Sequence, residues 1–152
     1  MKGTTTSEFF LKKILPNHLS PFEERSEQDK MAALVESALK DSRHAMIEAG
    51  TGTGKSIAYL VPSILNCVRE KKKLIVSTYT KVLQLQLIQK DIPLVRKIFN
   101  ECGLDFKFAV FYGGENYLCL RKFARDFPDL LSGRELSKKF ANWRMTTATG
   151  LL

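Results

Sequence analysis

The chain has 152 residues, 44% of them apolar, which is enough for one buried core and argues against an entirely disordered chain. It carries 24 Lys and Arg against 16 Asp and Glu, and the net charge of +8 arises after residue 60, which favours a polyanionic partner. No apolar run approaches the ~20 residues of a membrane span. The N-terminus has no secretion signal, and three cysteines without CxxC spacing argue against a disulfide scaffold. We therefore expect a cytoplasmic protein.

The first predicted elements are a lead-in and a helix. Residues 1–21 form a lead-in that Pro16 and Pro21 interrupt. Ser26 and Asp29 then have the spacing of a capping box, which predicts the start of a helix. Apolar residues follow at helical spacing and form one stripe: Met31, Leu34, Val35, Ala38 and Leu39.

Three short apolar segments alternate with further helices. Residues 44–49, 74–78 and 107–112 are predicted strands, and 57–68 and 80–90 are predicted helices. Pro62 is expected to bend the first of these helices, and Pro93 to interrupt the second before 94–100 continue it. This alternation predicts an α/β fold, a parallel sheet with flanking helices. Beyond Gly113 the chain becomes a basic, predominantly helical stretch.

Residues 49–56, AGTGTGKS, have the spacing of a phosphate-binding loop. Glycines let backbone N–H groups approach phosphate oxygens, and the helix that follows presents its positive end to them. Lys55 would contact the β- and γ-phosphates, and the Ser56 hydroxyl would bind Mg²⁺. The predicted phosphate-binding residues are Gly50, Thr51, Gly52, Thr53, Gly54, Lys55 and Ser56. The alternative, a chance match in a flexible turn, is disfavoured by the position between a predicted strand and a predicted helix.

Kinases, GTPases, transporters and helicases all share this loop. Four flanking segments identify a narrower class of protein. They are FEERSEQ (22–28), STYTKVLQLQL (77–87), KDIP (90–93) and GGENYLC (113–119). In order and spacing these segments, together with the loop, resemble the DinG/XPD-type superfamily 2 DNA helicases. The resemblance runs from about Phe9 to the end of the chain.

This resemblance implies a RecA-like P-loop NTPase domain that uses ATP and Mg²⁺, with Lys55 and Ser56 at the catalytic centre. Arg25 and Gln28 match the family's adenine-recognition motif, and an amide suits the adenine edge. The segment at 77–87 matches the motif that holds single-stranded DNA, through Ser77, Thr78, Thr80, Gln84 and Gln86. The implied activity is ATP-dependent helicase movement, 5′ to 3′, in DNA repair or replication, on single-stranded DNA or DNA junctions.

Cys119 matches the first of four cysteines that hold a [4Fe–4S] cluster in family members, and the other three would lie downstream. The resemblance divides the chain into a lead-in (1–21), the first part of a helicase ATP-binding domain (22–112) and the start of an iron–sulfur insertion (113–152). A basic stretch with Trp143 in the last part is expected to line a DNA path or to form a solvated helix face. Its residues are Arg121, Lys122, Arg125, Arg134, Lys138, Lys139 and Arg144.

No apolar strand in the sequence ends in the Asp-Glu pair that helicases use to hold Mg²⁺ and activate water. We therefore expect the N-terminal portion of a longer helicase, an incomplete first helicase domain that hydrolyses little ATP alone and aggregates readily. Three alternatives remain open: another P-loop enzyme such as a kinase or GTPase, a non-catalytic module that binds nucleotide or single-stranded DNA, and an RNA helicase.

Overall fold

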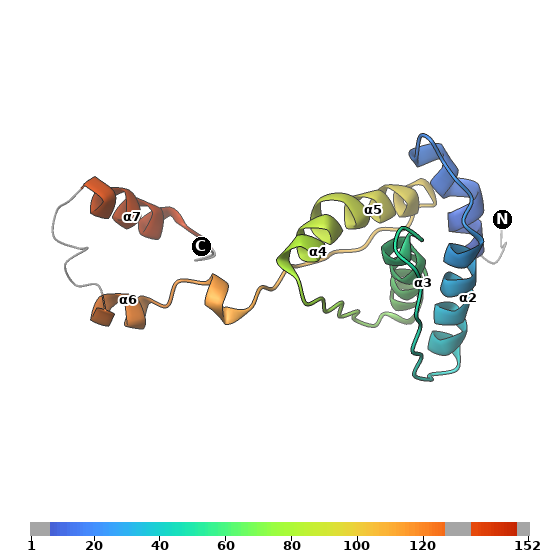
Figure 1. The fold of residues 1–152 in the computed structure, drawn as a ribbon, viewed down its shortest axis with the longest axis horizontal. Helices are drawn as coiled ribbons and strands as arrows, with labels where there is room; N and C mark the ends of the chain where they lie inside the picture. The colour runs from blue at the N-terminus through green and yellow to red at the C-terminus, as the bar shows by residue number, and fades with distance from the viewer. Residues whose placement is uncertain (1–6, 127–134, 149–152) are drawn as a thin grey trace. The chain divides into compact units, whose positions relative to one another are not determined.

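The structure is a computed structural model that describes residues 7–126 and 135–148 (Figure 1). Residues 1–6 of the predicted lead-in and Arg134 of the basic stretch lie outside the described residues. The chain divides into two compact units, Met1–Phe108 and Ala109–Leu152. Within the described ranges, no helix is both long and apolar enough to cross a membrane.

The lead-in is helical from Ser7 to His18 and forms part of the core of the first unit. It contains α1 (Ser7–Phe9), the π-helical turn η1 (Phe10–Ile14) and the 3₁₀ turn η2 (Leu15–His18). Phe10, Leu11 and Leu15 are buried. The Phe10 ring stacks on that of Phe99 with centroids 4.5 Å apart, so the lead-in packs against the far end of the unit's sequence.

Helix α2 (Ser26–Lys40) confirms the predicted helix, but the predicted capping box is wrong. Arg25 is the N-cap residue, and no side chain caps the helix. The Arg25 carbonyl accepts hydrogen bonds from the backbone N–H groups of Gln28 (2.9 Å) and Asp29 (3.2 Å). The Asp29 carboxylate lies 3.8 Å from the Lys12 ammonium of the lead-in, so it pairs with a cation instead of completing a cap.

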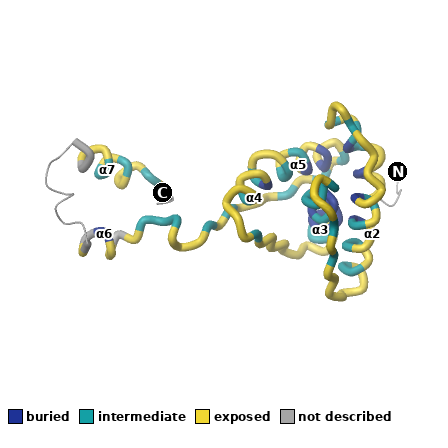
Figure 2. The backbone as a smooth tube through the Cα atoms, viewed as in Figure 1, coloured by how far each residue is buried: buried dark blue, intermediate teal, exposed yellow. Residues whose placement is uncertain are grey.

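Helix α3 (Lys55–Glu70) lies beside α2 and has the longest buried face of the unit (Figures 1 and 2). It confirms the predicted helix after the phosphate loop, and Pro62 lies inside it. Half of its residues are buried: Ile57, Ala58, Leu60, Val61, Pro62, Ser63, Ile64 and Leu65. This face supports the phosphate loop at the N-terminus of the helix.

The next helical segment runs through Pro93. Helix α4 (Lys81–Gln86) passes into a π-helical turn, η3 (Leu87–Asp91), and then into α5 (Ile92–Glu101). Pro93 lies in the first turn of α5, where its missing N–H and fixed φ cost little. The sequence predicted that Pro93 would interrupt the helix. The structure instead shows a change of helix type just before Pro93.

The structure assigns no strand to the described residues, so the three predicted strands and their parallel sheet are not confirmed. Residues 44–49, 74–78 and 107–112 have no helical or strand assignment. Ile75 and Phe111 are 90% and 86% exposed. A strand exists only when a neighbour completes its hydrogen bonds, and strand preference depends strongly on that context. These segments have the composition of strands but no paired neighbour among the described residues.

The second unit contains η4 (Gly114–Asn116), α6 (Leu120–Asp126) and α7 (Glu135–Thr146). The Phe123 ring stacks on Phe140 at 4.6 Å, and Phe140 lies 5.4 Å from Trp143 between ring centroids. Aromatic packing therefore holds α6 against α7. The two helices agree with the helical stretch expected beyond Gly113.

Candidate nucleotide-binding site

The phosphate loop leads directly into α3 and is shaped by two glycines with positive φ. Gly52 and Gly54 have φ values of +77° and +76°, which residues with a Cβ rarely adopt. The Thr53 hydroxyl donates to the Gly50 carbonyl at 3.0 Å and closes the turn. Gly54 is the N-cap of α3, so the free N–H groups of a 16-residue helix begin at this loop. Free N–H groups and a helix dipole make such a place suitable for an anion.

Lys55 is the first residue of α3, and its side chain turns back over the loop. Its Nζ donates to the carbonyls of Ala49 and Gly50, both at 2.8 Å. The ammonium therefore lies within the curve of the loop. A phosphate oxygen is a stronger acceptor for an ammonium than a neutral carbonyl, so a bound triphosphate would attract the Lys55 donors.

Gln28 connects the start of α2 to the phosphate loop. It is buried, and its Nε2 donates to the Gly54 carbonyl at 3.0 Å. A Cβ on Gly54 would collide with this amide, so the contact requires glycine there, independently of φ. The sequence predicted Gln28 as an adenine contact. The structure adds a direct contact with the loop that no sequence pattern had indicated.

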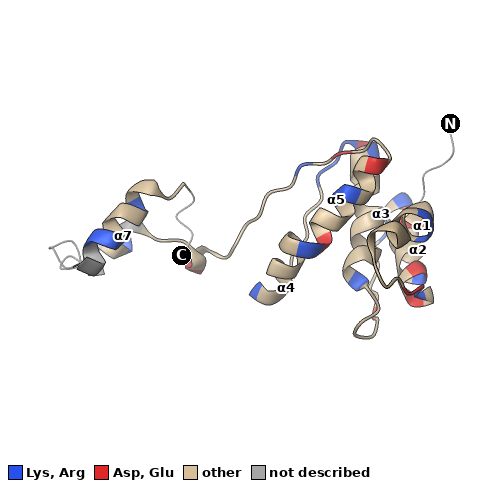
Figure 3. Cartoon of the chain, turned by 90° about the horizontal axis from the view of Figure 1, so that it is seen from above, with Lys and Arg blue, Asp and Glu red and all other residues tan. Residues whose placement is uncertain are grey.

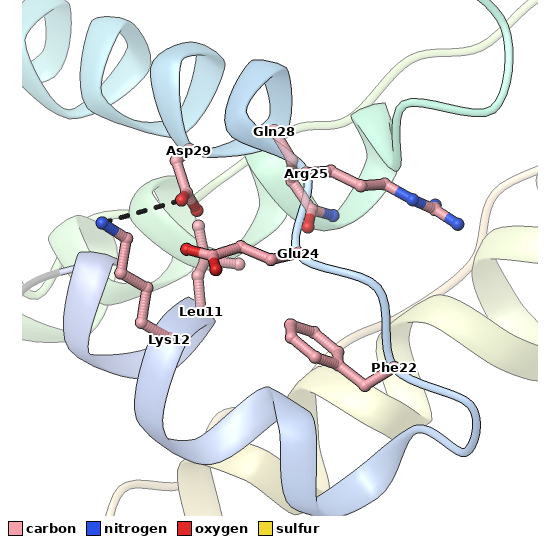
Figure 4. Close-up of a pocket in the computed structure, with 7 residues that line it drawn as sticks. All are labelled: Leu11, Lys12, Phe22, Glu24, Arg25, Gln28 and Asp29. Atoms are coloured by element: carbon pink, nitrogen blue, oxygen red, sulfur yellow. Dashed lines mark ion pairs between the residues drawn. The ribbon is translucent and has the colours of Figure 1, made fainter.

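A small hollow at the start of α2 contains both residues predicted to contact adenine (Figure 4). Arg25 and Gln28 lie on one side of it, and the Phe22 ring lies below them. The full lining is Leu11, Lys12, Phe22, Glu24, Arg25, Gln28 and Asp29. An aromatic face beside amide, guanidinium and carboxylate groups is suited to a planar, polar-edged ring.

The lead-in contributes a wall of this hollow, which the sequence analysis missed. Lys12 donates to Glu8 at 3.0 Å and lies 3.8 Å from Asp29. The hydrogen bond to Glu8 is the main reason that the Lys12 pKa is raised above its ordinary value. The available signal was the apolar spacing of Phe10, Leu11, Ile14 and Leu15, which is typical of a helix packed on one face.

Ser56, the predicted Mg²⁺ ligand, lies near a second hydroxyl that the sequence analysis did not identify, that of Tyr59 one turn further along α3. Burial is the main reason that the pKa of the Tyr59 phenol is raised. The nearby Asp91 carboxylate acts in the same direction, and the Ser56 hydroxyl acts against it.

The residues predicted to contact DNA lie in the segment before α4 and on that helix. Thr80 is the N-cap of α4, and its hydroxyl oxygen accepts from the Leu83 N–H at 3.2 Å. Ser77 is exposed and Thr78 is half-buried. On the helix, Gln84 is half-buried, and the exposed Gln86 donates from Nε2 to Asp91 at 3.3 Å. The five residues lie along one continuous stretch of chain, from the last two residues of 74–78 to the end of α4.

Cys119 belongs to the second unit and is exposed directly before α6. The backbone N–H of Lys122 is the main cause that lowers the pKa of its thiol, and the N–H and charge of Arg121 act in the same direction. Burial instead raises the pKa of the half-buried Cys67 and Cys102 thiols. Over the ranges that the structure describes, no three His, Cys, Asp or Glu side chains are grouped as metal ligands.

Comparison with known proteins gives one family and several related sequences. A sequence model of the family described as DEAD/DEAH box helicase matches residues 27–137. The ATP-dependent helicase DinG of Mycobacterium tuberculosis (strain H37Rv) is 46% identical over 99 residues, covering 64% of this chain and 15% of that protein. The ATP-dependent DNA helicase YoaA of Haemophilus influenzae is 38% identical over 147 residues, covering 93% and 22%.

A further relative carries a different activity in its name. The 3′-5′ exonuclease DinG of Bacillus subtilis is 39% identical over 111 residues, covering 73% of this chain and 12% of that protein. The chain thus spans between 12% and 22% of the length of these three relatives. The matched residues include the phosphate loop, Gln28 and α4.

Proposed function

Because this chain belongs to the DEAD/DEAH box helicase family, we propose that it is the ATP-binding part of an ATP-dependent DNA helicase. The relatives confirm the resemblance to DinG-type helicases that the motifs indicated. One observation carries the proposal. The loop 50–56 leads into α3 with its glycines in the required conformation, and the Lys55 ammonium lies within the curve of the loop.

In this proposal the loop and α3 hold the triphosphate. N–H groups of residues 50–56 surround the β-phosphate, and Lys55 exchanges its two carbonyl acceptors for phosphate oxygens. The Ser56 hydroxyl would be one Mg²⁺ ligand. The ion would supply charge neutralisation on the β- and γ-phosphates.

The adenine is proposed to bind in the hollow at the start of α2. Arg25 and Gln28 offer donors and an acceptor to its polar edge, and Phe22 offers an aromatic face. Gln28 also donates to the Gly54 carbonyl, so one side chain contacts both the base site and the phosphate loop. Guanine presents a different edge, and we expect the hollow to prefer adenine.

We propose that residues 44–49, 74–78 and 107–112 are strands of a RecA-like sheet in the complete helicase domain. Their exposed apolar side chains, among them Ile75 and Phe111, support this assignment, because such side chains gain most from burial on both faces of a parallel sheet. The proposed domain boundaries remain 1–21, 22–112 and 113–152.

Single-stranded DNA or a DNA junction is the proposed partner, held at Ser77, Thr78, Thr80, Gln84 and Gln86. Hydroxyl and amide groups hydrogen-bond phosphates without reading sequence, as a moving helicase requires. Movement from 5′ to 3′ is part of the proposal. Cys119 is proposed as one cluster ligand, but the described residues do not group a full ligand set around it, so no chemistry is assigned to a cluster.

Binding of fluorescent ATP with Mg²⁺ to this chain tests the proposal. We expect the wild-type chain to bind and Lys55→Ala to bind at least about ten-fold more weakly, because a charge-assisted phosphate contact is lost. Lys40→Ala removes an exposed lysine at the other end of α2 and is the matched control. Equal affinity in wild type and Lys55→Ala would contradict the proposal, as would equal affinity for ATP and GTP.

A further inference from the structure

Tyr79 presents a bare aromatic ring at a fixed point of the surface. Its side chain is fully exposed, and it directly precedes Thr80, the N-cap of α4. The Thr80 hydroxyl oxygen accepts the Leu83 N–H at 3.2 Å, which fixes the backbone next to the ring. A tyrosine that folds into a core buries about 150–250 Å². The Tyr79 ring instead keeps both of its faces available to a ligand.

The chain around this ring is strongly basic. Residues 71–90 contain five lysines and no acidic residue. All five are exposed: Lys71, Lys72, Lys73, Lys81 and Lys90. Acidic residues lie directly outside this segment, Glu70 before it and Asp91 after it. The Lys72 ammonium lies 3.9 Å from the Glu70 carboxylate. Lys81 is the first residue of α4 and its one charged residue (Figure 3).

Polar and apolar groups flank the ring on its two sides along the chain. Ser77 and Thr78 precede it with hydroxyl groups, and Val82, one residue beyond Lys81, is 77% exposed. A protein partner would be expected to need fewer lysines, since charged groups are depleted from the centre of protein interfaces. Exposed lysines, hydroxyls and one bare ring together favour single-stranded nucleic acid, whose phosphates and bases use all three.

We propose that Tyr79 is a platform on which one base of single-stranded DNA stacks, while the surrounding lysines hold the phosphates. The inference rests on the proposed function and deepens it, because it assigns a base contact where only backbone contacts were expected. Stacking on an aromatic ring tolerates every base, so it adds affinity without making the site sequence-specific.

Binding to oligonucleotides tests the platform. Fluorescence anisotropy would compare this chain with Tyr79→Ala, Tyr79→Phe and Val82→Ala on labelled oligo-dT and on an abasic strand of equal length. We expect Tyr79→Ala to weaken binding to oligo-dT by about five- to hundred-fold, and Tyr79→Phe to retain it. On the abasic strand all four proteins should bind alike. Val82→Ala removes a neighbouring apolar side chain without an aromatic face and should bind like the wild type.

Three results would overturn the platform: unchanged binding of Tyr79→Ala to oligo-dT, an equal loss on both strands, or a loss in Tyr79→Phe as large as in Tyr79→Ala. A double Lys73→Gln, Lys81→Gln variant distinguishes a failure of the stacking platform alone from a failure of the proposed function. It should weaken binding to both strands and reduce the salt dependence. If the wild-type chain binds neither strand, the platform and the DNA contact fail together. ATP binding then tests the nucleotide site separately.

Discussion

The helices of the first unit and the apolar segments between them contain the same residue types in opposite environments. Ile98 on α5 is fully buried, whereas Ile75 is 90% exposed. Phe99 is fully buried against Phe10, whereas Phe108 is 44% exposed. The difference follows from hydrogen bonding. A helix completes its backbone hydrogen bonds within one segment and can then pack its apolar face, whereas a strand requires a second segment before it can pack.

The phosphate loop lies on the boundary between these two kinds of region. It follows residues 44–49, which are exposed except for the half-buried Ile47 and Ala49, and ends at the first turn of α3, the most extensively buried helix (Figure 2). Its glycine conformations and the Gln28 contact come from the helical side. We therefore expect the nucleotide site to depend on the packing of α2 and α3.

Among variants that are expected to fold, the largest loss of stability comes from emptying the helical core. Phe99→Ala should reduce the free energy of unfolding by about 3–5 kcal/mol, because it leaves a cavity beside Phe10. Phe108→Ala is the matched control in an exposed segment and should cost less than about 1 kcal/mol. Urea denaturation followed by circular dichroism measures both. Similar losses in the two variants would remove the distinction between core and segment.

A methyl group on Gly54 should have the next largest effect. Gly54→Ala forces a side chain into φ +76° and into the Gln28 amide, which should cost about 1–3 kcal/mol and abolish binding of ATP with Mg²⁺. Gly103→Ala has a similar φ of +70° but open space around its Cβ, so it should cost only the backbone strain and keep binding. Isothermal titration calorimetry and denaturation measure the two effects. Full ATP binding by Gly54→Ala would contradict the site.

Removing the Gln28 amide should have a smaller effect on stability. Gln28→Ala breaks the 3.0 Å bond to the Gly54 carbonyl, which should cost about 1 kcal/mol of unfolding free energy and weaken ATP binding. Gln89→Ala, at an exposed position of η3, is the control and should change neither quantity. If Gln28→Ala weakened ATP and GTP binding by equal factors, Gln28 would act only through the loop and would not recognise the base.

The smallest expected effect is also the most direct test of the exposed segments. Ile75→Lys should change the free energy of unfolding of this chain by less than about 0.5 kcal/mol, because the side chain is already in water. Ile98→Lys, in the helical core, should prevent folding because it buries an unpaired charge. Thermal melts of both variants measure these two changes in stability. A loss of several kcal/mol in Ile75→Lys would mean that residues 74–78 are buried in solution, as in a formed sheet.

Helical periodicity was enough to predict α2, α3 and the helix that follows Thr80, because each of these elements depends on contacts three or four residues apart. The capping box failed because Asp29 has a long-range partner, Lys12. The lead-in was missed because its two prolines suggested an irregular segment, although its apolar residues pack into the core. Both errors concern contacts between segments far apart in sequence.

The phosphate loop, helices α2 to α5 and the family could be predicted from the amino-acid sequence, because glycine placement, helical spacing and a lysine after the loop are local properties. Two contacts became visible only in the folded chain: the Gln28 amide donates to the Gly54 carbonyl, and the lead-in lines the hollow beside Arg25. These contacts depend on how the helices pack, and the packing is determined by the shapes of many side chains together.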